Sequence, residues 1–282
     1  DEFEFSGLSV VCTNPQTDSY ADYRCDFELW EVDSGFLMYI GCNVTYSDYF
    51  DDGTLRTFLT YGIDRQSLVD NNYGGLALPT TLPISPMSPY YSKSLAATYD
   101  YDEMRFIDAA SKLRVPTNDK GVTRTLKLLV NSDDSARLRC ARNIAATLTE
   151  LGLACETVES PTSVYEARLQ AANYDIYLGI TKLPTTADLS EFYRQWGEMS
   201  WGGLANETIY NMVNQSLADR GNYYNLHKLV ADDGRIIPVM AGYYAIYAKR
   251  GVLSDLNPAR DNVFYYTLGK TMESSKVATQ FS

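Results

Sequence analysis

Apolar positions between residues 125 and 180 alternate between the period of a strand and the period of a helix. Short apolar runs alternate with segments that repeat apolar residues every three or four positions, and Gly152 ends the longest helical segment. The pattern predicts, in order, a strand at 126–130, a helix at 135–151, a strand at 153–158, a helix at 163–172 and a strand at 174–179. Such a βαβαβ run with short connections implies parallel strands joined by right-handed crossovers.

The part of the chain before this run combines strands with short helices. Residues 9–11, 27–30 and 36–40 are β-rich and are separated by turn residues, so they predict three strands. Apolar residues between Leu55 and Ile63 are spaced as on one face of a helix, and Asp64 is positioned to cap the next helix.

Prolines and glycines interrupt the pattern at residues 73–91, which therefore cannot form a helix or a central strand. Helices are predicted again at 102–113 and around Leu226 to Val230. Asp188 and Glu191 form a capping box for a helix that carries Leu189, Phe192 and Trp196. Asn206 is predicted to cap a further helix, which Gly221 would close. The segment from Ile236 onward returns to strand.

Charge and composition exclude several classes of partner. The chain has 24 basic and 36 acidic residues, a net charge of −12, so bulk electrostatics oppose binding to nucleic acid or to an anionic membrane surface. The apolar, uncharged stretch 236–248 is too short to span a bilayer. Tyrosine is abundant, with 23 residues, and is typical of adaptable recognition surfaces.

Candidates for catalysis or metal binding are few. His227 is the single histidine, and its apolar neighbours indicate a structural role. The five cysteines, Cys12, Cys25, Cys42, Cys140 and Cys155, form no CxxC pair; a Cys12–Cys25 bridge and five unpaired thiols both remain open. The paired aspartates all lie where helix capping explains them. We therefore expect no catalytic residue, no metal site and no cofactor, and no enzyme activity.

The predicted topology itself indicates where a ligand binds. Ligands of open α/β sheets bind beyond the carboxyl ends of the parallel strands. In this chain those ends lie near Asn131–Asp133, Ser160–Pro161 and Gly179–Thr181. A binding site is expected along this edge of the sheet.

One ordered series of motifs resembles a known family. Tyr39-Ile40-Gly41-Cys42-Asn43 precedes Leu55–Val69, which contains Ile63-Asp64-Arg65; Gly74–Pro79, the proline-rich run to Tyr91 and Tyr101-Asp102 follow. This order is similar to the family 5 extracellular solute-binding proteins, the oligopeptide- and dipeptide-binding group of ABC importers. The resemblance extends over about residues 36–250 and includes the βαβαβ run. The Ile63-Asp64-Arg65 junction is its most specific part.

The resemblance implies an architecture and a set of site residues. It implies the second lobe of a periplasmic-binding-protein-like fold, an α/β lobe whose mixed sheet contains the parallel βαβαβ unit and is flanked by helices. Residues 1–282 would form this one lobe. Within it, residues 236–282 would form a tail that in relatives partly returns to the first lobe. The candidate ligand-binding residues are Tyr165, Leu169, Gly179, Ile180, Thr181, Lys182, Leu183 and Trp201, expected on one concave surface. Leu183 stands where peptide-binding relatives have the aspartate that holds the peptide ammonium, and Ile180 stands where they have tryptophan. Lys182 favours an anionic ligand, and a solvated loop residue is an equally good interpretation.

The function implied is that of a solute-binding lipoprotein of an ABC transporter, located outside the cytoplasmic membrane or in the periplasm. Its partners would be a peptide or small-molecule ligand, a membrane permease and the first lobe of the same protein, which is not in this sequence; nucleic acid is not expected. The alternative is a surface sensor or protein-interaction module that reuses the same lobe.

Overall fold

The computed structural model describes residues 10–14, 26–51, 53–251, 253–254, 258–260 and 269–270, and it divides the chain into two compact units. Unit 1 comprises residues 1–34 and 242–282, and unit 2 comprises residues 35–241. The second boundary lies close to residue 236, where the sequence predicts the start of the tail. The first 34 residues, assigned from sequence to the same lobe as the rest, group with that tail. The assignment of 1–282 to one lobe remains a prediction.

In unit 1, β1 (Val10–Thr13) pairs antiparallel with the final part of β7 (Ile236–Lys249). Ile246 and Ala248 form a small apolar cluster with side chains of β1 and of β2 (Phe27–Cys42). Arg260 forms an ion pair with Asp33, and β8 (Leu253–Ser254) pairs antiparallel with β9 (Gly269–Lys270). Cys25 lies outside the described residues, so a Cys12–Cys25 bridge stays a prediction.

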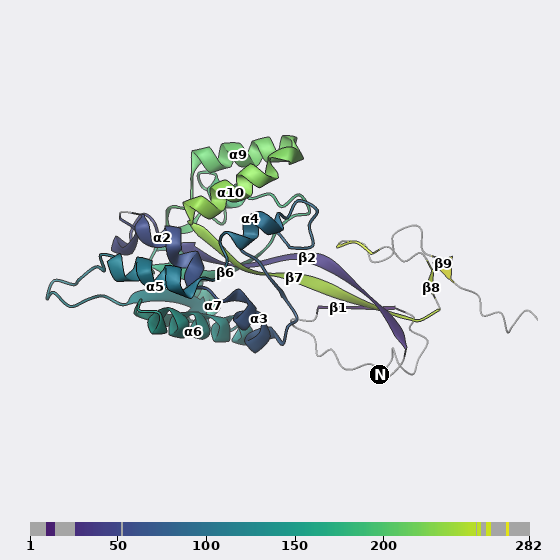
Figure 1. The fold of residues 1–282 in the computed structure, drawn as a ribbon, viewed down its shortest axis with the longest axis horizontal. Coiled ribbons are helices and arrows are strands. Elements are labelled where there is room, and N and C mark those ends of the chain that lie inside the picture. The colour runs from purple at the N-terminus through teal and green to yellow at the C-terminus, as the bar shows by residue number, and fades with distance from the viewer. Residues whose placement is uncertain are drawn as a thin grey trace, which may run out of the picture. The chain divides into compact units, whose positions relative to one another are not determined.

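Unit 2 is built around a mixed sheet in the order β7–β2–β6–β4–β5, with the short β3 (Leu78–Pro79) on β7 (Figure 1). β4 (Leu126–Asn131) lies between β5 (Cys155–Ser160) and β6 (Ile176–Lys182) and is parallel to both. β2 pairs antiparallel with β6. The predicted parallel βαβαβ unit within a mixed sheet is therefore confirmed.

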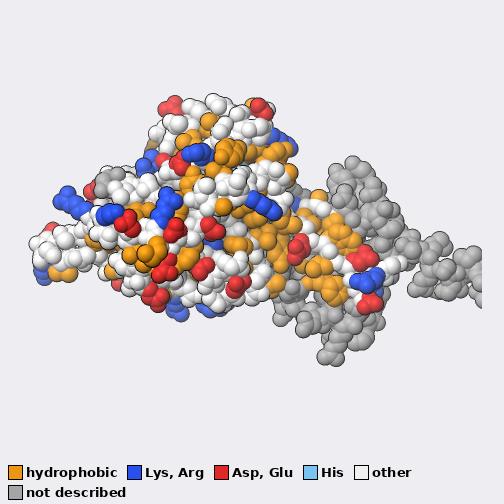
Figure 2. All heavy atoms as spheres, in the orientation of Figure 1, with side chains coloured by type: hydrophobic (Ala, Val, Ile, Leu, Met, Phe, Trp, Pro, Cys, Tyr) orange, Lys and Arg blue, Asp and Glu red, His pale blue; other side chains and the backbone are white. Residues whose placement is uncertain are grey.

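Helices cover both faces of this sheet (Figure 1). They are η1 (Asp48–Phe50), α2 (Thr54–Phe58), η2 (Leu59–Gly62), α3 (Arg65–Tyr73), α4 (Lys93–Ala97), α5 (Glu103–Lys112), α6 (Ser135–Glu150), α7 (Thr162–Gln170), α8 (Ser190–Tyr193), η3 (Trp201–Gly203), α9 (Glu207–Ala218), η4 (Arg220–Asn222) and α10 (Tyr223–Asp233). The visible surface of unit 2 mixes acidic and basic side chains with apolar ones (Figure 2).

Alternation along the strands separates two apolar clusters. Met38 and Ile40 of β2 pack with α2, α3, α5 and α6, and we call this set the α6-side cluster. Leu37 and Tyr39 point to the opposite face and pack with α4, α7, α8, α9 and α10, the α10-side cluster. Each central strand contributes to both clusters, so the sheet is buried on its two faces, as parallel sheets usually are.

Several local predictions hold at the level of single hydrogen bonds. The side chains of Asp64 and Asn206, predicted as caps, each accept a backbone N–H in the first turn of α3 and α9. Asp102, at the start of the helix predicted over 102–113, caps α5 in the same way. Residues 73–91 contain no helix beyond the end of α3 and only the two-residue β3.

Four local predictions were wrong. α9 ends at Ala218, so Gly221, which lies in η4, does not close it. The strands predicted at 27–30 and 36–40 are one strand, β2, because Gly35 with a φ of 79° lets the backbone continue through a bend. The helix predicted over Leu55–Ile63 divides into α2 and η2. α8 ends after four residues: Glu191 pairs with Arg194 instead of completing a capping box.

Candidate functional site

The carboxyl ends of β4 and β5 are joined by a hydrogen-bond network. Asn131 Nδ2 donates to Thr162 Oγ1 at 3.0 Å, and Asp133 Oδ2 accepts from Thr162 N at 2.9 Å and from Thr162 Oγ1 at 2.7 Å. These hydrogen bonds lower the pKa of Asp133. The Ser132 amide also donates to Ser160 O at 2.8 Å. The edge predicted from topology therefore exists and is held in a defined geometry.

Arg137 lies in the first turn of α6 at this edge. Its backbone N–H donates to the carboxylate of Asp134, the helix N-cap. Only 6% of the residue is exposed, and its guanidinium lies over the ring of Tyr165, 5.4 Å from the ring centroid. The nearest carboxylate oxygen is Asp134 Oδ2, 3.7 Å from Nε. Among the described residues the guanidinium has no hydrogen-bond acceptor.

Four of the predicted site residues belong to the α10-side cluster: Tyr165, Leu169 and Leu183 are buried in it, and Trp201 packs against it. Tyr165 is 6% exposed, and its hydroxyl donates to Leu178 O at 3.0 Å; burial raises its pKa to about 12. The Leu183 amide donates to Gly35 O at 2.8 Å, and its side chain is buried. The position where relatives have the aspartate is therefore an apolar, buried position in this chain.

Gly179 provides space for a tyrosine. Gly179 is paired with Tyr39 and Gly41 with Tyr177 in the register of β2 and β6. A Cβ added to Gly179 would lie 2.6 Å from Tyr39 Cζ, and one added to Gly41 would lie 2.2 Å from Tyr177 Cε1. Each aromatic ring therefore covers the glycine of the other strand, and the face of Gly179 is already occupied.

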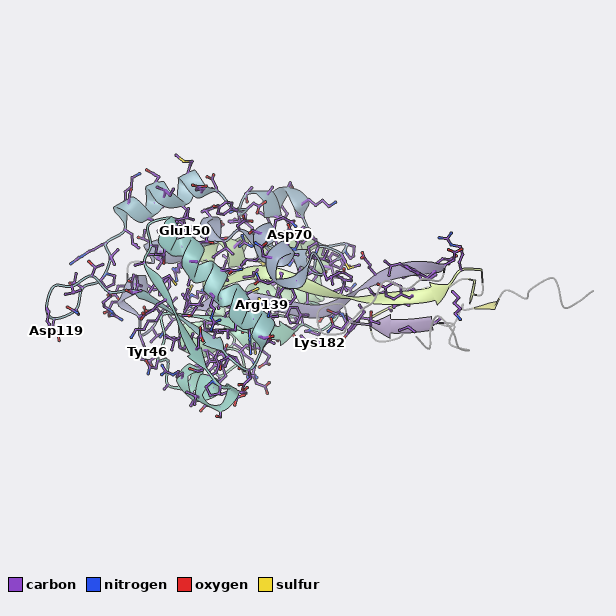
Figure 3. The ribbon with its side chains drawn as sticks, turned by 90° about the horizontal axis from the view of Figure 1, so that it is seen from below. Tyr46, Asp70, Asp119, Arg139, Glu150 and Lys182 are labelled. Atoms are coloured by element: carbon purple, nitrogen blue, oxygen red, sulfur yellow. The ribbon has the colours of Figure 1, made fainter. Side chains whose placement is uncertain are left out.

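Ile180 and Lys182 lie on the other face of the sheet. Ile180 pairs with Met38, which belongs to the α6-side cluster, whereas Thr181 pairs with Leu37 of the α10-side cluster. Ile180 is 37% exposed and Lys182 is exposed at the end of β6 (Figure 3). The single concave surface expected for Tyr165 and Ile180 is therefore not formed, because α7 packs Tyr165 against the α10-side face while strand alternation turns Ile180 to the other face.

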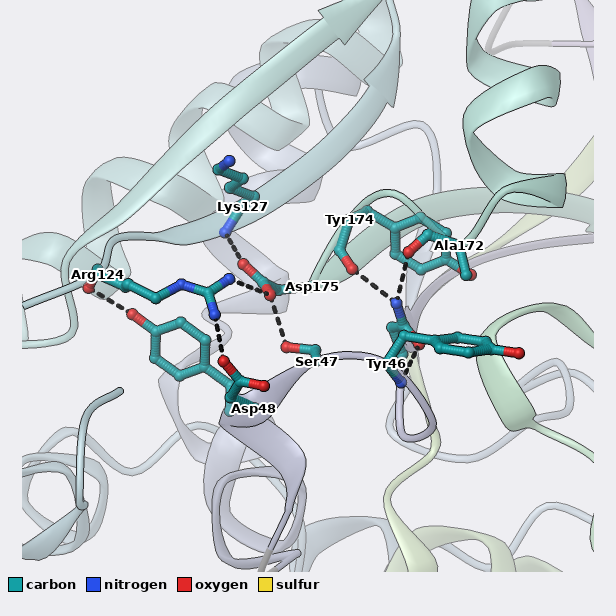
Figure 4. Close-up of polar contacts among 10 residues, drawn as sticks. Tyr46, Ser47, Asp48, Arg124, Lys127, Ala172, Tyr174 and Asp175 are labelled. Carbon is teal, nitrogen blue, oxygen red and sulfur yellow. Dashed lines mark hydrogen bonds and ion pairs between the residues drawn. The ribbon is translucent and has the colours of Figure 1, made fainter. Parts of the chain in front are cut away.

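The other end of β6 is held by a separate polar cluster around Asp175 (Figure 4). Asp175 is 3% exposed, and its carboxylate accepts hydrogen bonds from Ser47 Oγ at 2.5 Å and from the Lys127 amide at 2.9 Å. Arg124 Nη2 lies 3.7 Å from Oδ1 of the same carboxylate. These contacts fully explain a buried carboxylate, so we assign this cluster a structural role.

Unit 2 also contains a pocket and a buried histidine. A pocket of about 250 Å³, open to solvent, is lined by Arg65, Lys93 and Asp100, among others, and by none of the predicted site residues. His227 is fully buried, and burial lowers its pKa to about 4. Within the described part of the chain, no group of three or more His, Cys, Asp or Glu side chains is arranged to hold a metal ion.

Comparison with known proteins identifies the family. The family model of the bacterial extracellular solute-binding proteins, family 5 middle region, matches residues 10–203. The chain belongs to this family. A search of curated proteins finds no significant match. No helix of the described residues is long and apolar enough to cross a membrane.

Solved structures of this family 5 type share the fold at low sequence identity. The ABC transporter substrate-binding protein CtaP of Listeria monocytogenes has a TM-score of 0.74 at 14% identity, covering 96% of this chain and 57% of that one. AppA of Bacillus subtilis, an oligopeptide-binding protein in complex with a nonapeptide, has 0.69 at 16%, covering 94% and 56%. NikA of Brucella suis, in complex with Fe(III)-EDTA, has 0.71 at 13%, covering 95% and 59%. The chain spans a little more than half the length of these proteins.

Arg137 was missed by the sequence reasoning. The sequence identifies the edge at Asn131–Asp133 but contains no signal that an arginine four residues later is buried. Its position in the first helical turn after a parallel strand is the only available clue.

Proposed function

We propose that this chain is the ligand-binding part of the solute receptor of an ABC importer and that it binds a peptide or another small solute between two lobes. The observation that supports this most strongly is the family match over residues 10–203 on a fold shared with solute-binding proteins. Closure of two lobes around a ligand would then present the loaded receptor to a membrane permease.

We place the ligand at the carboxyl edge of β4, β5 and β6. The proposed contacts at the carboxyl end of β6 are Ile180, Thr181 and Lys182. Trp201 is also in the predicted set, but η3 lies beside Asn43 and Tyr174, next to the amino end of β6. The buried members of the predicted set, Tyr165, Leu169, Gly179 and Leu183, would form the wall behind Thr181, whereas Ile180 and Lys182 would meet the ligand from the other face of the sheet. We place the protein outside the cytoplasmic membrane or in the periplasm, anchored as a lipoprotein, with the permease and the first lobe as its partners.

The test is a thermal-shift and calorimetric screen of the whole receptor encoded by the gene that contains this chain. A library of peptides, organic acids and metal chelates should contain at least one compound that raises the melting temperature, since a ligand at 100 times its Kd stabilises by about 2.7 kcal/mol. A receptor that no compound stabilises, but that binds another protein in the same assay, would favour the sensor or interaction module instead.

The isolated chain should bind the same ligand much more weakly. One lobe supplies only part of the contacts, while immobilising the ligand still costs several kcal/mol. We expect a Kd in the millimolar range for the chain, measured by NMR titration beside the whole receptor. A micromolar Kd for the chain alone would contradict a site completed by a second lobe.

A further inference from the structure

The pocket beside α3 and α4 is lined by charges of both signs. It has a volume of about 250 Å³, is open to solvent, and has Arg65, Lys93 and Asp100 in its wall. Arg65 is only 2% exposed, whereas Lys93 and Asp100 are exposed. Among the described residues, none of these three forms an ion pair. The wall therefore presents two cations and one carboxylate that no described residue neutralises.

The charge of Arg65 is buried but not cancelled. Its guanidinium donates to the carbonyl oxygens of Pro238, Thr60 and Ile63 and to the Thr60 hydroxyl, and all four acceptors are neutral. Burial lowers the pKa of Arg65 to about 10, so the group stays protonated at neutral pH. A buried cation that has only neutral acceptors favours an anionic group in the adjoining pocket.

The polar wall of the pocket is held in place by backbone atoms of neighbouring elements. The Thr80 amide donates to Val239 O of β7 at 3.2 Å, and Thr81 Oγ1 donates to Ala96 O of α4 at 2.9 Å. Burial raises the pKa of Tyr91, whereas hydrogen bonds with the Thr80 and Thr81 hydroxyls lower it. Three hydroxyl groups thus lie together in the wall, and binding a ligand there needs little ordering of side chains.

The placement of Asp100 decides which class of ligand fits. Burial lowers the pKa of Arg65 and raises that of Tyr91, and the Asp100 charge raises both, so this carboxylate acts across the pocket. A ligand with only a negative charge would be repelled by Asp100, and one with only a positive charge would be repelled by Arg65 and Lys93. A zwitterion satisfies all three charged groups.

We propose that this pocket is a second ligand site, which binds a free α-amino acid as its zwitterion, the carboxylate toward Arg65 and Lys93 and the ammonium group toward Asp100. The volume is below the roughly 300–1,000 Å³ of pockets for drug-sized ligands, which favours a single amino acid over a peptide. None of the residues predicted for the solute site lines this pocket. The proposal therefore does not depend on the solute bound at the edge of β4, β5 and β6.

The test is a titration of the 282-residue chain with L-alanine, L-alaninamide and propionate at neutral pH and constant ionic strength. The backbone amide NMR signals of Thr80 and Thr81 report binding in the pocket. L-Alanine should move both signals in a saturable way. L-Alaninamide lacks the carboxylate and propionate lacks the ammonium group, so each should bind about fivefold or more weakly than L-alanine.

Substitutions of the exposed charged residues give changes of opposite sign for different probes. Asp100→Asn should weaken L-alanine about threefold or more but strengthen propionate, because the repelling carboxylate is gone. Lys93→Gln should weaken both. The matched controls are Asp119→Asn and Lys120→Gln, in an exposed loop (Figure 3), which make the same charge changes and should leave every affinity within about twofold.

A steric block completes the test without a change of charge. Ala97 is an exposed residue of the same wall, and Ala97→Phe should abolish the response of Thr80 and Thr81 to L-alanine. Signals that do not saturate, equal binding of the three probes, or an Asp100→Asn chain in which L-alanine and propionate change alike would each overturn the inference. So would an Ala97→Phe chain that still binds L-alanine.

Discussion

Acidification should destabilise this protein through His227, the single histidine of the chain. The imidazole is fully buried in α10, and neither ring nitrogen has a hydrogen-bond partner among the described residues. Burial alone lowers its pKa from 6.5 to about 4, and no charged group contributes. The folded chain therefore keeps a neutral imidazole at pH values where the unfolded chain binds a proton.

The sign and size of the effect follow from this difference. The unfolded state gains a proton below pH 6.5, whereas the folded state gains it only near pH 4, so the free energy of unfolding falls as the pH drops between these values. The full loss below pH 4 is about 3 kcal/mol, and at pH 5 it is about 2 kcal/mol relative to pH 8. Above pH 6.5 this residue makes no pH-dependent contribution.

Urea unfolding from pH 4.5 to 8 on the original chain and on His227→Gln measures this loss. The variant removes the titrating group but leaves every carboxylate in place, so the difference between the two curves reports the imidazole alone. In parallel, the Cε1–Hε1 NMR signal of the one histidine should titrate near pH 4. A midpoint at or above pH 6, or a difference between the curves that does not change with pH, would refute the reasoning.

Three further variants test the packing that positions the site. Asp175→Asn should lower the free energy of unfolding by about 3 kcal/mol, because a buried charge-assisted network loses its anion. Asp48→Asn removes an exposed partner of Arg124 and should lower the free energy of unfolding much less in the same urea titration. Gly179→Ala should lower the free energy of unfolding by about 1–3 kcal/mol, because its Cβ meets Tyr39. In a double-mutant cycle, Tyr39→Leu should remove part of this loss, and strictly additive losses would contradict the contact. Asn206→Ala should cost about 1 kcal/mol through loss of the α9 cap, visible as a lower melting temperature, and an unchanged melt would show that the cap is dispensable.

The sequence determined the features that depend on near neighbours in the chain. The strand and helix periods of residues 126–182 predict β4, α6, β5, α7 and β6 to within a few residues, because each element must turn an apolar face toward a core. The caps Asp64 and Asn206 were predictable for the same reason: a side chain and the amide it accepts from lie two or three residues apart. The topology of the parallel strands then predicted the edge at which we propose that the ligand binds.

Tertiary structure alone decided which side chains share that edge. Ile180 and Tyr165 lie on a strand and a helix, and only the packing of α7 against one face of the sheet shows that they are separated. Arg137 and Arg65 are both arginines in the first turn of a helix, yet one finds four acceptors and the other none. Acceptors for Arg65 come from Pro238, 173 residues away, and from a neighbouring turn. Burial and hydrogen-bond satisfaction depend on such distant contacts, which no local pattern of residues records.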